Sequence, residues 1–427
     1  MNSFESGLLH AQQLDAVDPL RPYRDRFYLQ PDTYYMDGNS HGLLSKDAEA
    51  AVLQSLDDWK RLAVEGWTTA QRPWFHLPET LGAWTAPLVG AHPHEVVVTG
   101  TATTNLHTLL ATFYRPRGTR TKILADDDNF PSDLYALHSH LRLHHRPDTD
   151  LVRLSTDHAG HIDESRLIAA MSPDVALVLL PSVWYKSGQL ANLERLTAAA
   201  HERGILIGFD CCHSIGVVPH ALHDWGVDFA VWCNYKYLNA GPGATAGLYV
   251  HERHHHEAPG LAGWFGTAKE HQFDMGFPQE PAPSAGRWQI STPPVLATVA
   301  GGASLQMIAE VGIAAIREKS LRQTAFLRTQ IEQRILTAGL GGAIVTPEAA
   351  DCRGGHIAFA HPHAVQISQA LKARNVIPDY RPPNIVRLAP IPLYTSFEDI
   401  CHTVDILRDI LADKTYERFG PNRNIVS

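Results

Sequence analysis

The stretch Ile205-Leu206-Ile207-Gly208-Phe209-Asp210, taken together with the later stretch Phe229-Ala230-Val231-Trp232, decides the fold. Each is a short apolar run, which predicts a strand buried inside a sheet. The first run ends at Asp210, and the second is followed closely by Tyr235 and Lys236. In an open α/β sheet the carboxyl ends of the strands line the ligand crevice. We therefore expect Asp210 and Lys236 to lie side by side at that edge.

A carboxylate and an amine at one sheet edge have two interpretations. They suit pyridoxal 5'-phosphate (PLP), because a lysine forms the Schiff base and an aspartate keeps the pyridine nitrogen protonated as an electron sink. They equally suit a partly buried ion pair that only ties two strands together. From Asp210 and Lys236 alone, both interpretations stand.

Strand and helix patterns alternate on either side of these runs. Strands are expected at 95–99, 122–125, 150–154, 175–183, 205–210 and 228–232, and helices at 46–62, 106–113, 131–143 and 193–203. Continuous apolar strands are buried on both faces, which predicts an α/β fold with a mostly parallel sheet flanked by helices. The apolar stripe of the 46–62 helix is interpreted as core packing, and the stretch before residue 34 as an irregular entry.

Beyond residue 291 the pattern changes to long helices mixed with short strands, which predicts a smaller α+β lobe. The chain has 427 residues, enough for a large core and a second lobe. We expect a segment 1–45 that contributes to the small lobe and the active site, a large domain 46–305, and a small domain 306–427. The cleft between the lobes is the expected place for substrate.

The composition is that of a soluble globular protein, with 44% hydrophobic and 19% charged residues. A formal charge of -9 argues against nucleic acid as a partner, because phosphate binding needs clustered Lys and Arg. The sequence has no long apolar span and no apolar segment at its start, so we expect no membrane partner and a cytoplasmic location. Five cysteines without paired spacing predict reduced thiols rather than disulfides or zinc.

Histidine is abundant, at 25 residues. His251, His254, His255 and His256 lie close together, and His251 and His255 would share a face if the segment were helical. No carboxylate pattern completes a recognised metal motif, so we expect a polar, solvated connection and no metal.

The turn Gly100-Thr101-Ala102-Thr103-Thr104-Asn105 joins a β-branched strand to a helix. Small hydroxyl residues at such a turn leave backbone amides free for an anion, which suits a phosphate group. The alternative is an ordinary N-cap without a ligand.

The motifs together resemble the kynureninases, which are PLP-dependent hydrolases of the fold-type I, aminotransferase class V group. The resemblance runs from Asp37-Gly38-Asn39-Ser40 to Arg387-Leu388-Ala389-Pro390, nearly the whole chain. Its most specific part is His223-Asp224-Trp225-Gly226-Val227-Asp228-Phe229, which leads into Tyr235-Lys236-Tyr237-Leu238-Asn239-Ala240-Gly241. Further family-like stretches are Asn105-Leu106-His107, Phe130-Pro131-Ser132-Asp133, Gly263-Trp264-Phe265-Gly266 and Ile290-Ser291-Thr292-Pro293-Pro294.

The resemblance implies a seven-stranded-type sheet and a role for each matching position around the cofactor. Lys236 would be the Schiff-base lysine, Asp210 the partner of the pyridinium nitrogen, and Tyr235 an acid that also reaches the phosphate. The remaining implied cofactor contacts within the chain are Ala102, Thr103, Phe130, Pro131, Ser132, Asp133 and His213. Phe130 would stack on the cofactor ring.

Other implied roles concern the substrate and a second subunit. Residues matching Trp264 and Thr292 reach the phosphate of the neighbouring subunit in the family, so the active unit would be a homodimer with shared active sites. Arg387 would clamp the α-carboxylate of a small amino-acid substrate, which its planar fork suits. Trp67 would contact the ring of that substrate, and Ser40 and His41 would also bind it.

The implied reaction is hydrolysis of kynurenine, or its 3-hydroxy form, to an anthranilate and alanine in tryptophan catabolism and NAD biosynthesis. Trp67 and Thr292 resemble the bacterial type, which favours kynurenine itself. His41 stands where leucine is usual beside Ser40, and Thr267 where histidine is usual. These departures, with Cys211-Cys212 in place of Leu-Ala, leave the substrate more open than the reaction.

Three rivals remain at this point. One is a paralogue that acts on a ring-modified kynurenine. Another is a different class V enzyme, such as a desulfurase, for which Cys352 is the sole candidate cysteine. The third is a non-catalytic metal-binding or regulatory protein that keeps the fold.

Overall fold

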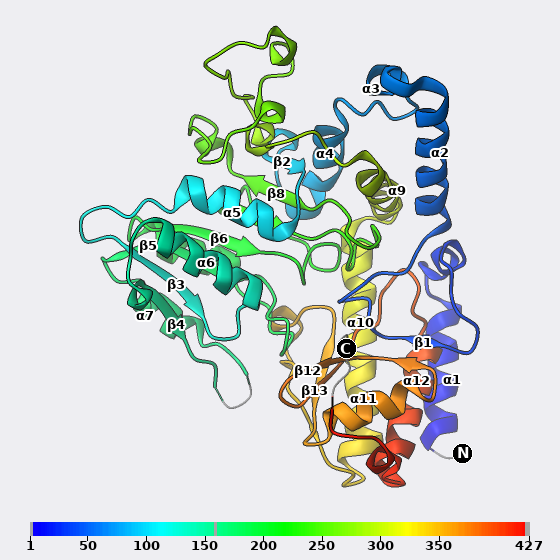
Figure 1. The fold of residues 1–427 in the computed structure, drawn as a ribbon. Helices are drawn as coiled ribbons and strands as arrows, with labels where there is room; N and C mark the ends of the chain where they lie inside the picture. The colour runs from blue at the N-terminus through cyan, green and yellow to red at the C-terminus, as the bar shows by residue number, and fades with distance from the viewer. Residues whose placement is uncertain (1–2, 158–159, 423–427) are drawn as a thin grey trace.

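A seven-stranded sheet forms the centre of the computed structural model, which describes residues 3–157 and 160–422 (Figure 1). The strand order is β2-β8-β7-β6-β5-β3-β4. Only β8 runs antiparallel to its neighbours within this described sheet. The expectation of a mostly parallel sheet is therefore confirmed. The strands are β2(Val96–Val98), β3(Lys122–Asp126), β4(Leu151–Leu154), β5(Val175–Pro181), β6(Leu206–Asp210), β7(Phe229–Trp232) and β8(Gly247–Val250).

Helices cover both faces of this sheet. Alternate residues of β5 point to opposite sides: Leu177 and Leu179 join the core beneath α5 and α6, whereas Val178 and Leu180 join the core beneath α4, α8 and α9. Continuous apolar strands follow from this burial on both faces. The helices are α1(Ser3–Ala16), α2(Lys46–Leu62), α3(Gly66–Thr69), α4(Leu77–Val89), α5(Ala102–Phe113), α6(Pro131–Leu143), α7(Glu164–Ala170), α8(Leu193–His201), α9(Val295–Val311), α10(Ile313–Ile331), α11(Ala364–Lys372) and α12(Phe397–Ala412).

A separate core lies beneath α10, α11 and α12 and a four-stranded antiparallel sheet of order β12-β13-β10-β9. Its strands are β9(Ala343–Ile344), β10(Ile357–Ala360), β12(Asp379–Arg381) and β13(Ile385–Leu388). Residue 305 lies inside α9, whose buried side chains pack on the core of the large sheet. The division at 45 and 305 stays a prediction.

The start of the chain is helical, so the expected irregular entry is wrong over α1. Asp15 accepts hydrogen bonds from the backbone N–H groups of Phe397 and Glu398, at 2.8 and 2.9 Å, and so holds α1 against the start of α12. β1(Tyr34–Tyr35) pairs in parallel with β11(Val376–Ile377). The N-terminal segment therefore packs with the C-terminal lobe.

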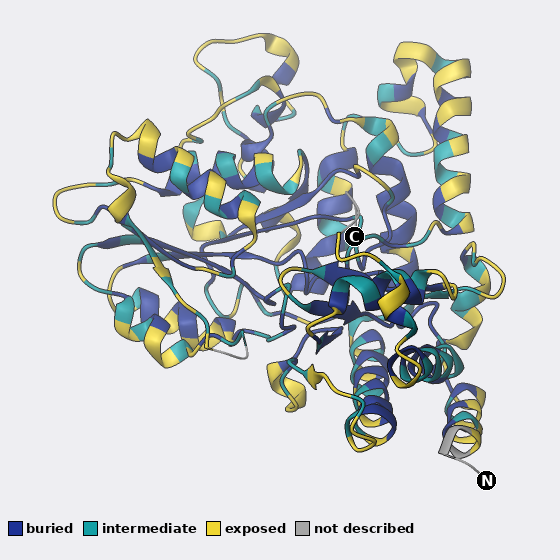
Figure 2. Ribbon diagram, turned by 60° about the horizontal axis from the view of Figure 1, so that its bottom comes forward, coloured by how far each residue is buried: buried dark blue, intermediate teal, exposed yellow. Residues whose placement is uncertain are grey.

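The apolar stripe of α2 is core only in part: Ala48 is buried and Val52 packs against the core of the large sheet, whereas the rest of the stripe is exposed, contrary to the sequence interpretation. Leu53 and Trp59 are each 59% exposed, and Leu56 is 41% exposed, on a helix that stands largely free of the sheet (Figure 2). Helical spacing predicts a shared face, but it does not specify what covers that face.

No single helix in the described part of the chain is long and apolar enough to span a membrane. Only α9 with the helical stretch that follows it passes that test as a pair, and the two are bent by 82°.

Candidate active site

Asp210 and Lys236 line one pocket at the carboxyl end of the large sheet, as the strand pattern predicts. β6 ends at Asp210, and Lys236 follows β7, the adjacent parallel strand. The pocket is lined by Ala102, Thr103, Phe130, Ser132, Asp133, Pro181, Val183, Tyr185, Asp210, Cys212, His213, Tyr235 and Lys236. Nine of these were expected as site residues, and they come together from four strand ends and the helices that follow.

Sequence reasoning missed Pro181, Val183, Tyr185 and Cys212 as pocket residues. Pro181 is the last residue of β5, and Val183 and Tyr185 follow it closely. The rule that placed Asp210 and Lys236 therefore also points to these residues.

The acidic side of the pocket holds two carboxyl groups. Asp210 Oδ1 accepts a hydrogen bond from the backbone N–H of Cys212 at 2.7 Å, which fixes its rotamer. Burial and the charge of Asp210 raise the pKa of Asp133 well above its usual range, which favours the protonated form of Asp133 beside Asp210. Two carboxyl groups this close disfavour a second negative charge.

Lys236 lies between an imidazole and an aromatic ring. Its Nζ is 3.0 Å from His213 Nε2 and 6.0 Å from the centre of the Phe130 ring. Burial and the nearby Lys236 charge lower the pKa of His213 well below its usual value, so the neutral imidazole accepts from the ammonium. Burial also lowers the pKa of Lys236, but the charges of Cys233, Cys212 and Asp210 outweigh it and raise that pKa on balance.

The opposite side of the pocket is built for an anion. Thr101 caps α5 by accepting a hydrogen bond from the backbone N–H of Thr104. Ala102 and Thr103, in the first turn of this helix, line the pocket, and the Thr103 and Ser132 hydroxyls are 2.7 Å apart. Free amides and hydroxyls at a helix N-terminus favour a phosphate group.

Arg387 lies in β13, behind Tyr185. Its side chain is fully buried; Nη1 donates to the backbone oxygen of Tyr185 at 2.7 Å, and the guanidinium is ion-paired with Asp379. Burial lowers the pKa of Arg387 to about 10, which leaves it charged at neutral pH. Its buried Nε has no hydrogen-bond partner among the described residues, and Arg387 is not among the residues that line the pocket.

Besides Arg387, six expected residues do not line the pocket of this chain: Trp67, Trp264, Thr292, Pro131, Ser40 and His41. Trp67 packs against Phe265, with ring centres 6.3 Å apart. Trp264 is 41% exposed and donates from Nε1 to the Gln272 backbone oxygen at 3.0 Å. Thr292 and Pro131 are exposed.

The turn that carries Ser40 and His41 lies next to the pocket without lining it. The His41 ring stacks near that of Tyr235, with centres 6.2 Å apart. The backbone N–H groups of Ser40 and His41 both donate to the Asp37 carbonyl.

The comparison with known proteins agrees with this geometry. The chain is 52% identical over 430 residues to the kynureninase of Geobacillus thermodenitrificans, covering all of both chains, and 50% identical over 425 residues to that of Bacillus anthracis, covering 99% of both. The chain belongs to the kynureninase family. Within this kynureninase-family chain, residues 316–407 match the kynureninase C-terminal domain.

Solved structures share the fold with this kynureninase-family chain at lower identity. The cysteine desulfurases of Thermococcus onnurineus and Escherichia coli each align with a TM-score of 0.76 and 18% identity, over 92% and 95% of this chain and 98% and 100% of theirs. C-DES, solved with glycine linked covalently to its PLP cofactor, also gives 0.76 and 18%, over 90% of this chain and 99% of its own. The predicted fold class is thereby confirmed.

Cys352 does not resemble a desulfurase nucleophile. It is exposed in the 3₁₀ turn Ala350–Cys352 and does not line the pocket. Partial burial and the nearby Asp351 raise the pKa of its thiol, whereas a nucleophilic cysteine needs a lowered one.

Proposed function

We propose that this chain hydrolyses L-kynurenine to anthranilate and L-alanine with PLP as cofactor. The observation that carries the proposal is the pocket that joins Lys236, Asp210 and Phe130 to the α5 turn, in a chain about half identical to kynureninases along its entire length. The relatives are named kynureninases, so the proposed substrate is a kynurenine, and the proposed reaction cleaves one of its carbon–carbon bonds.

The residues present fit PLP. The pocket offers an amine, a carboxylate, an aromatic face and an anion site on the first turn of α5, which are the groups that a pyridine aldehyde phosphate needs. His213 Nδ1 and Asp133 Oδ2 are buried without a hydrogen-bond partner among the described residues, so polar atoms are still unsatisfied there. Bound PLP supplies an electron sink for negative charge that develops on the substrate.

Lys236 would hold the cofactor covalently, and Thr103, Ser132 and the amides of Ala102 and Thr103 would bind its phosphate. Asp210 would hold a proton on the pyridine nitrogen. With its raised pKa, Asp133 would be protonated, would donate to Asp210 and would fix that carboxylate without adding a second charge.

Lys236 and Tyr235 are the residues that would move protons. His213 lies within hydrogen-bond distance of the amine, so a neutral imidazole is placed to share a proton with Lys236. Burial, with the charges of Cys233 and Cys212, raises the pKa of Tyr235, so its phenol keeps a proton to donate at the substrate's Cβ.

Arg387 would bind the substrate α-carboxylate. Its charge, its free Nε and its packing behind Tyr185 support this, and Asp379 keeps the guanidinium oriented. Loss of the carboxylate contact is expected to raise KM as well as lower kcat, since the arginine positions the reacting bond.

We further propose a cytoplasmic homodimer with shared sites, in tryptophan catabolism and NAD biosynthesis. Trp264 and Thr292 are exposed in this chain, away from its own pocket, as residues that complete a partner's site must be. An apolar groove lined by Trp59, Val64, Trp67 and Leu296 adds an uncovered surface of the kind that subunits bury.

Incubation of the PLP-loaded protein with kynurenine and with 3-hydroxykynurenine tests the activity, with the anthranilates and alanine followed over time. Lys236→Ala is expected to abolish product formation, and Lys414→Ala, at an exposed lysine, to leave it unchanged. Wild-type turnover in Lys236→Ala would refute the assignment. A Trp67→His and Thr292→Asn double variant is expected to shift preference toward the 3-hydroxy substrate; unchanged preference counts against these two positions.

A further inference from the structure

A cluster of metal-ligating side chains lies at the end of the large sheet away from the pocket. His92 precedes the short 3₁₀ turn Pro93–Glu95 that leads into β2, His223 lies between β6 and β7, and Glu252 follows β8. Because β8 is antiparallel to β7, its end lies beside the start of β7, opposite the strand ends that carry Asp210 and Lys236. The cluster is therefore separate from the PLP site.

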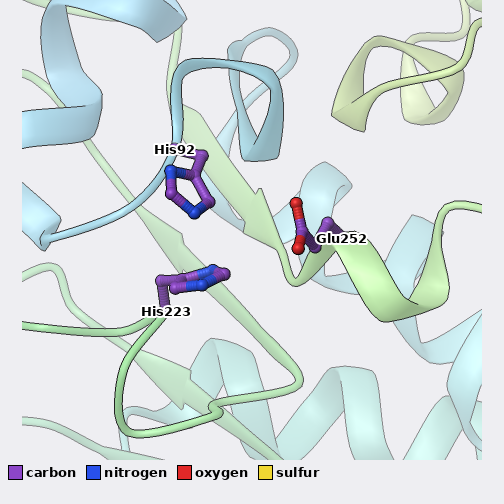
Figure 3. Close-up of side chains that lie close together, drawn as sticks. All are labelled: His92, His223 and Glu252. Atoms are coloured by element: carbon purple, nitrogen blue, oxygen red, sulfur yellow. The ribbon is translucent and has the colours of Figure 1, made fainter.

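The three side chains point into a common space (Figure 3). One ligand atom from each of His92, His223 and Glu252 lies within 4.8 Å of the other two. The rings of His92 and His223 have centres only 4.0 Å apart. Small side-chain rotations close such distances to those of a shared ion, because His92 and Glu252 are exposed and His223 is half-buried.

The Glu95 side chain holds two backbone segments and one ring of this cluster in place. Its fully buried carboxylate accepts hydrogen bonds from the backbone N–H of His92 at 2.9 Å and of Glu252 at 2.8 Å. It also lies 3.0 Å from His223 Nδ1, which must therefore carry the hydrogen. His223 then presents the lone pair of Nε2 outward, the arrangement in which a carboxylate fixes the tautomer of a metal-bound histidine.

Two more imidazoles flank the site. His94 Nε2 is 2.8 Å from Glu252 Oε2, and His251 stacks on His223 with ring centres 4.8 Å apart. His94 competes with an ion for Glu252, or joins it as a further nitrogen ligand. His251 and His255 do not share a helical face, since η5(Glu252–His254) is a 3₁₀ turn and His255 is hydrogen bonded to the Val250 oxygen.

We propose that His92, His223 and Glu252 bind one divalent transition-metal ion of the Zn²⁺ type, with Glu95 as the positioning residue. Two imidazoles and a carboxylate with an open position match zinc better than the oxygen-only sets of calcium or magnesium. The ligands come from three segments far apart in the sequence, so the ion cross-links the β2–β8 edge of the sheet. Because it binds only the folded chain, it stabilises the fold without taking part in catalysis.

The experiment is a ZnCl₂ titration of the PLP-loaded protein after chelator treatment, followed by calorimetry and by thermal unfolding. We expect one saturable site per chain and a rise in the unfolding midpoint. His92→Asn and Glu252→Gln are each expected to weaken zinc binding at least tenfold and to remove the rise, with kynurenine hydrolysis unchanged. The matched control is His256→Asn, at an exposed histidine of the same segment, which should bind zinc like the wild type.

Glu95→Gln is expected to weaken binding by roughly 10–100-fold through His223. Since Glu95 is buried and that variant can fail to fold, the two exposed ligand variants decide the matter. No saturable binding, or equal zinc affinity in His92→Asn, Glu252→Gln and wild type, would overturn the proposal and leave only a hydrogen-bonded histidine cluster.

Discussion

Asp228 joins the two strands that carry the catalytic pair, and its replacement gives a sharp prediction. The side chain is 1% exposed. It accepts hydrogen bonds from the Ile207 backbone N–H at 2.8 Å, from His201 at 3.0 Å, and from His254 at 2.7 Å, and it is paired with Arg253 at 2.5 Å. Ile207 lies in β6, three residues before Asp210, and Asp228 itself immediately precedes β7.

Asp228→Asn keeps the shape of the side chain but removes its negative charge. The new amide N–H₂ then faces groups that are themselves hydrogen-bond donors and cannot accept from it. Removing one partner of a buried ion pair costs about 3–5 kcal/mol. Because the His201 and Arg253 side chains are 33% and 37% exposed, water recovers part of their loss, and we expect the lower end, about 3 kcal/mol. Urea unfolding at fixed protein and PLP concentrations measures this as a lower midpoint with an unchanged slope.

The pH dependence of folding stability follows from the direction in which folding shifts the pKa of Asp228. Burial alone would raise the pKa of Asp228, but His201, His254 and Arg253 lower it well below the unfolded value of about 3.9. Its contribution is therefore complete above about pH 4 and is lost as the pH falls through the folded-state pKa. Asp224→Asn, at an exposed neighbour, should change stability by less than about 0.5 kcal/mol. An Asp228→Asn effect as small as that would refute the reasoning.

The remaining predictions concern the pocket and the surface. Asp133→Asn mimics a protonated carboxyl and should keep PLP binding and most of kcat. Asp210→Asn should lower kcat about 100-fold or more. Equal losses of kcat in the two variants would contradict the proposal that only one of these two carboxyl groups is charged. Tyr235→Phe should lower kcat roughly 100-fold with little change in KM, measured by steady-state kinetics; an unchanged kcat would exclude it as the acid. If the proposed homodimer forms through the groove beside α2, Trp59→Glu should give a monomer in sedimentation velocity and abolish activity that depends on a shared site; an intact dimer would place the interface elsewhere.

The sequence predicted the large sheet well because its strands are buried on both faces. Continuous apolar runs are distinctive, and α2, α6, β3 and β7 match the expected bounds to within one residue. The sequence did not predict elements whose structure depends on tertiary contacts. α1 is polar at its surface and is held by Asp15 at α12, and α4 carries Pro78 in its first turn and Pro87 inside, which disguise a helix.

The site was predictable to the extent that strand ends mark it. Asp210, Lys236 and the α5 turn follow from that rule, because parallel strands present their carboxyl ends together. The orientation of Asp133 and the contact between His213 and Lys236 do not follow, since they depend on side-chain packing across separate segments. The local sequence around the apolar face of α2 and around Trp264 does not show whether these side chains are buried in the core or exposed on the surface.

The central claim is that this pocket cleaves kynurenine with Lys236 as its essential residue. The most direct measurement is the yield of anthranilate and alanine from L-kynurenine with the PLP-loaded protein and with its Lys236→Ala variant. The predicted result is anthranilate and alanine in equal amounts from the wild type, and neither from the variant. Folded, PLP-loaded wild-type protein that forms no anthranilate would contradict the account.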